Sequence, residues 1–147
     1  MILSFSEYKS LSHQVTMVDG SFDPIHDGHI EYFRRAKELG YPVLCNIAPD
    51  SWTASKHPVL LEQKKRAVVL DSIRFIDFVT ASSSSTAAVL EAIKPKIYAK
   101  GKDWLDRGGI PVSEQEVCLR HHIEVVYLDT VLNSSTNLLR SVSSTNK

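Results

Sequence analysis

Ten residues near the amino terminus, GSFDPIHDGH from Gly20 to His29, gather two glycines, two histidines and two aspartates around a proline. His26 and His29 lie three residues apart, at the start of a stretch with helical spacing. Imidazoles in the first turn of a helix donate hydrogen bonds to phosphate oxygens, and the free main-chain N–H groups and the helix dipole attract the same anion. Gly20 and Gly28 allow the backbone to approach a ligand closely. The stretch therefore predicts a phosphate-binding turn.

Two other interpretations of this stretch remain open. A metal site is the first, although His-x-x-His brings no evident third ligand unless Asp23 supplies it. A plain turn made by Pro24 and Gly28, with both histidines on the surface, is the second. Asp23 also suits the start of a helix or the orientation of a substrate, whereas Asp27 is expected to be a solvent-facing spacer.

A second candidate anion pocket lies near the carboxyl end, in SSTNLLR from Ser134 to Arg140. The hydroxyl groups of Ser134, Ser135 and Thr136 stand at the start of a short helical pattern, where main-chain amides are free to bind an anion. Arg140 follows a turn later and adds a cation. Taken alone, the segment is better explained as an ordinary helix N-cap with a solvated arginine.

The elements that must position these residues alternate between strand and helix. Short apolar or β-branched runs predict strands at 14–19, 41–48, 75–81, 96–99 and 123–129. Helical spacing predicts helices at 29–40, 61–73, 82–93, 113–122 and 135–142, the fourth with a capping box of Ser113 and Glu116. The polar segment 50–58 is expected to be a mobile loop. The alternation predicts an α/β fold: a Rossmann-like single domain over residues 1–147, core at about 14–140, with a five-stranded parallel sheet and helices on both faces.

The composition argues against several classes of partner. The 147 residues include 17 basic and 17 acidic side chains, so the formal net charge is zero, whereas nucleic-acid binders usually show a basic excess. No apolar run approaches the roughly eighteen residues of a membrane span, and the amino terminus lacks a signal-peptide pattern. Cys45 and Cys118 lack CxxC spacing. They predict buried free thiols, which fit a cytoplasmic location. The balanced charge and the lack of a long apolar run predict a protein without nucleic-acid or membrane partners.

The two candidate anion pockets together resemble the nucleotidyltransferase superfamily. His26-Asp27-Gly28-His29 matches its HxGH signature, within the longer G-x-F-D-x-x-H-x-G-H form of cytidylyltransferase-like members. Ser134–Arg140 is similar to the second signature, S/T-S/T-T-x-I-I/L-R/K. The resemblance implies an enzyme in which an acceptor phosphate attacks the α-phosphorus of a nucleoside triphosphate and releases pyrophosphate.

A third segment narrows the resemblance. Lys100–Trp104, KGKDW, is similar to the KGGDY segment of heptose 1-phosphate adenylyltransferases, and 58–70 resembles their PxxPLEQRxxVL. Lys102 stands in place of the second glycine. Glycerol-3-phosphate cytidylyltransferases are the alternative, since Lys102-Asp103-Trp104 resembles their DDW-like segment. They tend to carry Arg-Thr-x-Gly before the second signature, whereas residues 130–133 here contain no arginine. ATP is therefore favoured over CTP.

The resemblance also implies roles for individual residues. His26 and His29 would bind phosphate oxygens, Arg140 would draw charge toward the leaving pyrophosphate, and Lys56 would close over the phosphates. The expected cradle and its neighbours are Gly20, Ser21, Phe22, Asp23, Gly28, Ser134, Ser135 and Thr136, and the acceptor or ribose is expected near Lys100, Gly101, Asp103 and Trp104.

Partners follow from the same resemblance. Mg²⁺ is expected with the triphosphate, without a dedicated protein metal site, and a sugar or polyol phosphate is the expected acceptor. A homodimer is possible, since relatives often dimerise. The hypothesis from another class is a non-catalytic nucleotide-binding regulatory module. A degenerate member would be expected to lose a signature histidine or the late motif, and this chain keeps both.

Overall fold

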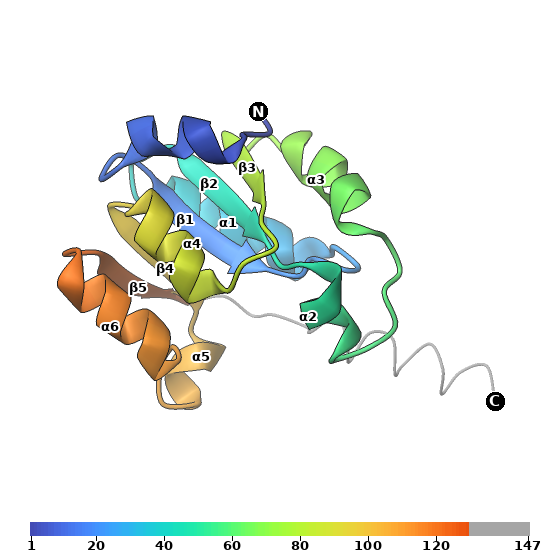
Figure 1. The fold of residues 1–147 in the computed structure, drawn as a ribbon. Coiled ribbons are helices and arrows are strands. Elements are labelled where there is room, and N and C mark those ends of the chain that lie inside the picture. The colour runs from blue at the N-terminus through green and yellow to red at the C-terminus, as the bar shows by residue number, and fades with distance from the viewer. Residues whose placement is uncertain (130–147) are drawn as a thin grey trace.

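The computed structural model describes residues 1–129, so the segment Ser134–Arg140 and the helix expected at 135–142 lie outside the described residues. Within residues 1–129 the strands form one parallel sheet in the order β3-β2-β1-β4-β5 (Figure 1). The strands are β1 Thr16–Gly20, β2 Val43–Ile47, β3 Phe78–Ala81, β4 Ile97–Gly101 and β5 Glu124–Leu128. The predicted α/β fold with a five-stranded parallel sheet is confirmed.

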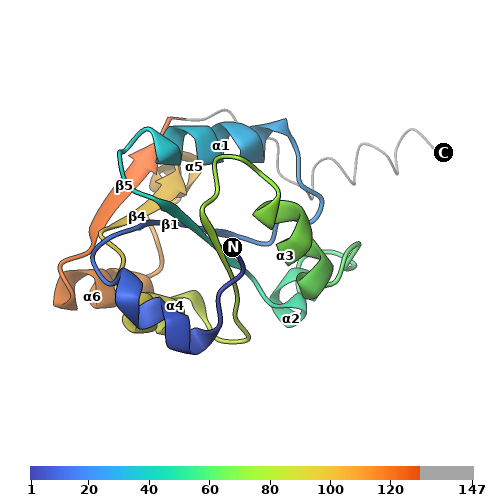
Figure 2. The same ribbon diagram turned by 90° about the horizontal axis from the view of Figure 1, so that it is seen from above.

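Helices cover both faces of this sheet, as expected. They are η1 Phe5–Leu11 (a 3-10 helix), α1 Asp27–Lys37, α2 Asp50–Ala54, α3 Gln63–Asp71, α4 Thr86–Ile93, α5 Asp103–Asp106 and α6 Val112–Arg120. Figure 2 shows α1 on one side of the strands and α4 and α6 on the other. Helix α3 packs against β2 and β3 on the same side as α1, whereas η1 packs against α4. No helix within residues 1–129 is long and apolar enough to cross a membrane.

The sheet has a hydrophobic cluster on each face. Phe33 and Ala36 of α1 and Leu70 of α3 pack on one face, over Val18 and Val79 of the strands. Val89, Leu90 and Ile93 of α4 and Val117 of α6 pack on the other, over Met17 and Leu44. Because β2 is buried on both sides, its sequence is apolar without alternation from Val43 to Cys45. Cys45 and Cys118 are buried free thiols, as predicted.

The structure corrects two predictions about local elements. The polar segment 50–58 begins as helix α2 instead of a loop, because the buried guanidinium of Arg66 binds Asp50 in its first turn and fixes its start. The capping box of Ser113 and Glu116 is absent. Helix α6 begins at Val112, one residue before Ser113, and its N-cap is Pro111, which makes no side-chain cap. The fixed φ of proline favours this earlier start and places Ser113 in the first helical turn.

The order of the strands creates a crevice at one edge of the sheet. The chain runs outward from β1 to β3 and then returns to add β4 on the other side of β1. Ligands of open α/β sheets bind beyond the carboxyl ends of the strands at such a switch point. The turn 20–29, which joins β1 to α1, lies at this edge.

Candidate functional site

A cavity of about 1120 Å³ opens at the carboxyl ends of β1, β2 and β4. Its walls come from the turn between β1 and α1, from α2 and the residues after it, from 83–87 at the start of α4, and from α5 and α6. Of the residues expected to bind the ligand, the lining includes Gly20, Ser21, Phe22, His29, Lys56, Lys100, Gly101, Asp103 and Trp104. Asp23, His26 and Gly28 are not among the residues that line it.

Both histidines cap helix α1, each through the Nδ1 atom of its own ring. His26 is the N-cap residue, and its Nδ1 accepts the N–H of Gly28 at 3.1 Å. The Nδ1 of His29 accepts the N–H of His26 at 3.3 Å, so the two form a reciprocal capping box. A nitrogen that accepts a hydrogen bond carries no proton, and the neutral ring therefore bears its hydrogen on Nε2. Each imidazole is left with one donor directed away from the helix backbone.

Burial keeps these rings neutral. Burial lowers the pKa of His29 from 6.5 to about 3, with a smaller part of that shift coming from the neighbouring His26. Burial also lowers the pKa of His26, although the charge of Asp27 opposes the change. The Nε2 of His26 is buried and has no hydrogen-bond partner within residues 1–129. At neutral pH the two rings are therefore uncharged, and each has a hydrogen-bond donor at Nε2.

The rest of the turn holds the histidines in place. Phe22 lies in the left-handed region with φ of 53°, and its ring contacts His29 edge to face at 5.1 Å between centroids. A side chain on Gly20 would place its Cβ 3.0 Å from the Phe22 ring, so the glycine leaves room for that ring. Asp27 is exposed as the first residue of α1, as expected of a spacer.

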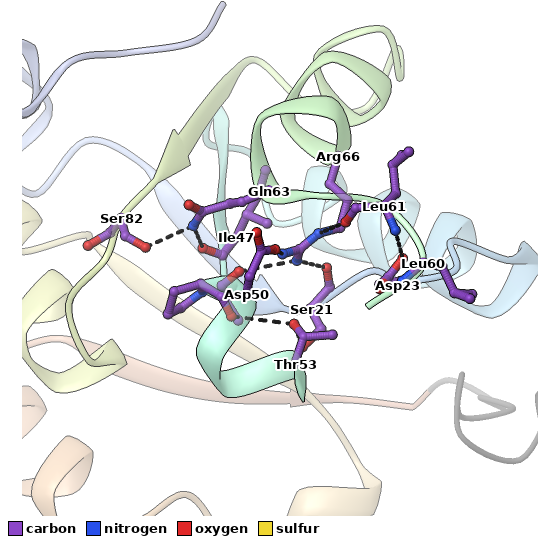
Figure 3. Close-up of polar contacts among 12 residues, drawn as sticks. Ser21, Asp23, Ile47, Asp50, Thr53, Leu60, Leu61, Gln63, Arg66 and Ser82 are labelled. Carbon is purple, nitrogen blue, oxygen red and sulfur yellow. Dashed lines mark hydrogen bonds and ion pairs between the residues drawn. The ribbon is translucent and has the colours of Figure 1, made fainter. Parts of the chain in front are cut away.

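Asp23 has a different position from the one expected of a ligand-binding residue. Its carboxylate is buried and accepts the main-chain N–H groups of Leu60 and Leu61, at 2.8 and 3.0 Å (Figure 3). These bonds tie the β1–α1 turn to the segment that precedes α3. Asp23 therefore supports the wall of the cavity instead of facing into it.

Three cations reach the cavity from different elements. Lys56 follows α2, Lys100 stands on β4, and Arg107 follows α5. Partial burial lowers the pKa of Lys56, and the charges of Arg107 and Lys100 lower it further. Like charges that perturb one another across an open cavity are suited to a ligand carrying several negative charges. The ring of Trp104 lies near both Lys100 (4.7 Å) and Arg107 (5.2 Å).

A family model described as cytidylyltransferase-like matches residues 17–146. The chain belongs to this family. Bifunctional protein HldE from Helicobacter acinonychis (strain Sheeba) is 32% identical over 124 residues, which is 80% of this chain and 26% of that protein. HldE from Pelobacter propionicus is 30% identical over 105 residues, or 68% and 21% of the two chains. The nucleotidyltransferase thus spans about a quarter of the length of these relatives.

Solved structures share the fold of this cytidylyltransferase-like chain. The lipopolysaccharide core biosynthesis protein from Thermoplasma volcanium GSS1 superposes with a TM-score of 0.65 at 20% identity, over 81% of this chain and 98% of that one. Pantothenate synthetase from Thermus thermophilus superposes with a TM-score of 0.64 at 12% identity, over 94% and 66%. At these identities the likeness concerns the fold alone.

Arg66 is a structural residue of the site that the sequence patterns missed. Its buried guanidinium donates to the main-chain oxygens of Leu61, Ser21 and Ala48 at 2.8, 2.6 and 3.1 Å. It also pairs with Asp50 at 2.5 Å (Figure 3). One side chain thereby joins the β1–α1 turn, the end of β2, the start of α2 and the residues before α3. The sequence offered one signal for this role, because Arg66 is next to Ala67 on the buried face of the helix.

Other cavity residues were also missed. Asp19, at the end of β1, accepts hydrogen bonds from Asn46 (2.7 Å) and Thr86 (3.0 Å), and its carboxylate lies 3.7 Å from Lys100. Arg107 and Glu114 also line the cavity. Within residues 1–129, no group of three or more His, Cys, Asp or Glu side chains is arranged to hold a metal ion.

Proposed function

We propose that this nucleotidyltransferase transfers a nucleoside monophosphate, from ATP in preference to CTP, to a sugar phosphate such as heptose 1-phosphate. The observation that carries the proposal is the convergence of Lys56, Lys100 and Arg107 on the cavity that His29 lines. The similarity of Lys100–Trp104 to KGGDY and the 30–32% identity to HldE support this choice of substrates.

The reaction is a single displacement at phosphorus. An oxygen of the acceptor phosphate forms a bond to the α-phosphorus, the bond from that phosphorus to the oxygen bridging to the β-phosphorus breaks, and pyrophosphate leaves with the electron pair. The attacking oxygen is already anionic near neutral pH, so no general base is needed. Catalysis then rests on alignment and on the neutralisation of developing charge.

The described residues suit these two tasks. The Nε2–H groups of His26 and His29 would donate to phosphate oxygens in the transition state. Lys56 and Arg107 would hold the triphosphate, while Lys100 would meet the acceptor phosphate. Mg²⁺ would enter as part of the Mg–nucleotide substrate, with few ligands from the protein. Free thiols at Cys45 and Cys118 are in keeping with a cytoplasmic location.

Pyrophosphate release, measured with each nucleoside triphosphate against a panel of sugar and polyol phosphates, tests the proposal. We expect the highest kcat/KM with ATP and heptose 1-phosphate. CTP with glycerol 3-phosphate is the second candidate pair, because Asp103 and Trp104 resemble the segment of those cytidylyltransferases, and a preference for it would replace the first. The enzyme hypothesis fails if no pair turns over and His29→Ala leaves nucleotide binding unchanged.

A further inference from the structure

The floor of the cavity contains a row of polar side chains on the face of the sheet that α4 and α6 cover. Along β1 the side chains on this face change from Met17 to Asp19, and along β2 they change from Leu44 to Asn46. Asp19 and Asn46 are paired in register. Both oxygens of Asp19 are occupied, since Asn46 donates to one, and Thr86 and Lys100 approach the other. The Asp19 carboxylate therefore keeps these three side chains in position.

Glu114 is different, because only half of its carboxylate is engaged. The side chain lines the cavity from the first turn of α6, and its Oε1 accepts the hydroxyl of Tyr98 at 2.7 Å. No other hydrogen bond to this carboxylate is formed by residues 1–129. Tyr98 is completely buried, so its hydroxyl fixes Glu114 in position. A fixed carboxylate with a free oxygen is a strong acceptor for a hydroxyl donor.

The charges around Glu114 indicate which part of a ligand it meets. Lys100 is its neighbour, with the ammonium 5.8 Å from the centre of the Tyr98 ring, and the charge of Lys100 acts on the Glu114 carboxyl. Burial raises the pKa of Glu114, and Asp19 raises it further. A phosphate is attracted by Lys100 and repelled by Glu114. A molecule that carries both a phosphate and hydroxyl groups satisfies both side chains in one orientation.

Building on the function proposed above, we propose that Glu114, positioned by Tyr98, binds a hydroxyl group of the acceptor and selects polyhydroxylated phosphates over simple phosphate esters. The phosphate of the acceptor then faces Lys100 and the histidines, while its hydroxyl groups face α6. Glu114 is thus a specificity-determining residue, and Tyr98 is a positioning residue that acts through it.

Binding measured by calorimetry, without turnover, tests this subsite directly. The probes are mannose 1-phosphate and methyl phosphate, which carry the same phosphate group with and without sugar hydroxyls. We expect the wild type to bind mannose 1-phosphate at least about tenfold more tightly, the size of effect of a hydrogen bond to a charged group. In Glu114→Ala this ratio should fall toward one, with the affinity for methyl phosphate retained. Equal ratios in the two proteins would overturn the proposal.

Kinetics separate this inference from the proposed function. With the acceptor that turns over, Glu114→Ala should raise the KM for that acceptor about tenfold or more and leave the KM for the nucleotide unchanged. Tyr98→Phe should give a smaller rise in the same constant. If the nucleotide KM rises instead, Glu114 faces the nucleotide and the inference is wrong, although the proposed function stands. If the wild type releases no pyrophosphate with any pair, the proposed function fails, and the binding ratio still decides on Glu114.

The matched control is Glu116→Ala. Glu116 is exposed on the same helix and is not among the residues that line the cavity. Its replacement by alanine therefore removes the same charge from α6 without changing the lining of the cavity. Both the binding ratio and the acceptor KM should remain at wild-type values. An equal change in the two alanine variants would mean that the net charge of α6, and not a contact by Glu114, causes the effect.

Discussion

The imidazoles of His26 and His29 stack with their centroids 3.8 Å apart, and each accepts a main-chain N–H of the same helix turn at Nδ1. The stacking and the two hydrogen bonds fix both the tautomer and the direction of Nε2. The helix that would bind the phosphate thereby also aligns its side-chain donors. Preorganised donors of this kind need no rearrangement when charge develops in a transition state.

Replacement of His29 by alanine should lower kcat about 10²- to 10³-fold, the usual cost of one preorganised donor. The nucleotide KM should change less, because the cations remain. Steady-state pyrophosphate release measures both constants. His122→Asn is the control: His122 is exposed with φ of 55°, a conformation that asparagine tolerates, and activity should be retained. Wild-type kcat in His29→Ala would show that the ring is not part of the chemistry.

The neutrality of His29 predicts a pH dependence of stability. The pKa of this imidazole is 6.5 in its ordinary state and about 3 when folded. Between these values the unfolded chain binds a proton that the folded chain does not, so the free energy of unfolding falls as the pH is lowered from 6.5 toward 3. We expect a loss of about 1 kcal/mol per pH unit from this group.

Urea unfolding at pH 7, 6, 5 and 4 measures this dependence. Wild type is compared with His29→Gln, which cannot titrate at this position, while all carboxylates are common to both proteins. The wild-type free energy of unfolding should fall more steeply with decreasing pH than that of the variant. Parallel curves would mean that the folded and unfolded chains protonate this imidazole alike.

The cavity cations predict a nucleotide-binding phenotype. Lys56→Ala should raise the KM for the nucleoside triphosphate about 10- to 100-fold, because it removes one charge-assisted contact to phosphate. The effect should shrink in high salt, since ions screen the attraction. Lys64→Ala removes an equal charge from an exposed position on α3 and should leave KM unchanged. A similar KM in both variants would exclude Lys56 from the triphosphate site.

Local patterns were enough to predict the sheet, both helix layers and the turn around His26 and His29, because strand and helix periodicity and N-cap chemistry are properties of short segments. They were not enough to place Lys100 beside Asp19. Those residues are far apart in the chain and meet only because β4 is added next to β1 in the sheet. The same limit applies to Arg107 and Glu114, which reach the cavity from elements that follow β4.

The error at 50–58 has a related cause. Its polar composition is typical of a loop, but a buried side chain from α3 supplies the partner for Asp50 that the segment itself lacks. Cavity walls of this kind are fixed by long-range hydrogen bonds that hydropathy does not reveal. This is why Arg66 and Asp23 contribute to the site without facing its ligand.

Arg66 therefore gives a prediction that joins stability to function. In Arg66→Lys a single ammonium group replaces the three nitrogens of the guanidinium. It cannot reach the main-chain oxygens of Ser21, Ala48 and Leu61 together with Asp50, so buried acceptors lose their hydrogen-bond partners. We expect a loss of about 2–3 kcal/mol in the free energy of unfolding. The nucleotide KM should rise as well, because α2, which leads to Lys56, is no longer tied to the β1–α1 turn.

The control is Arg35→Lys, on the exposed side of α1, which should change the free energy of unfolding by less than about 0.5 kcal/mol. Urea titration and pyrophosphate release on both variants measure the two effects, and a stable Arg66→Lys with an unchanged KM would show that these contacts do not hold the site together.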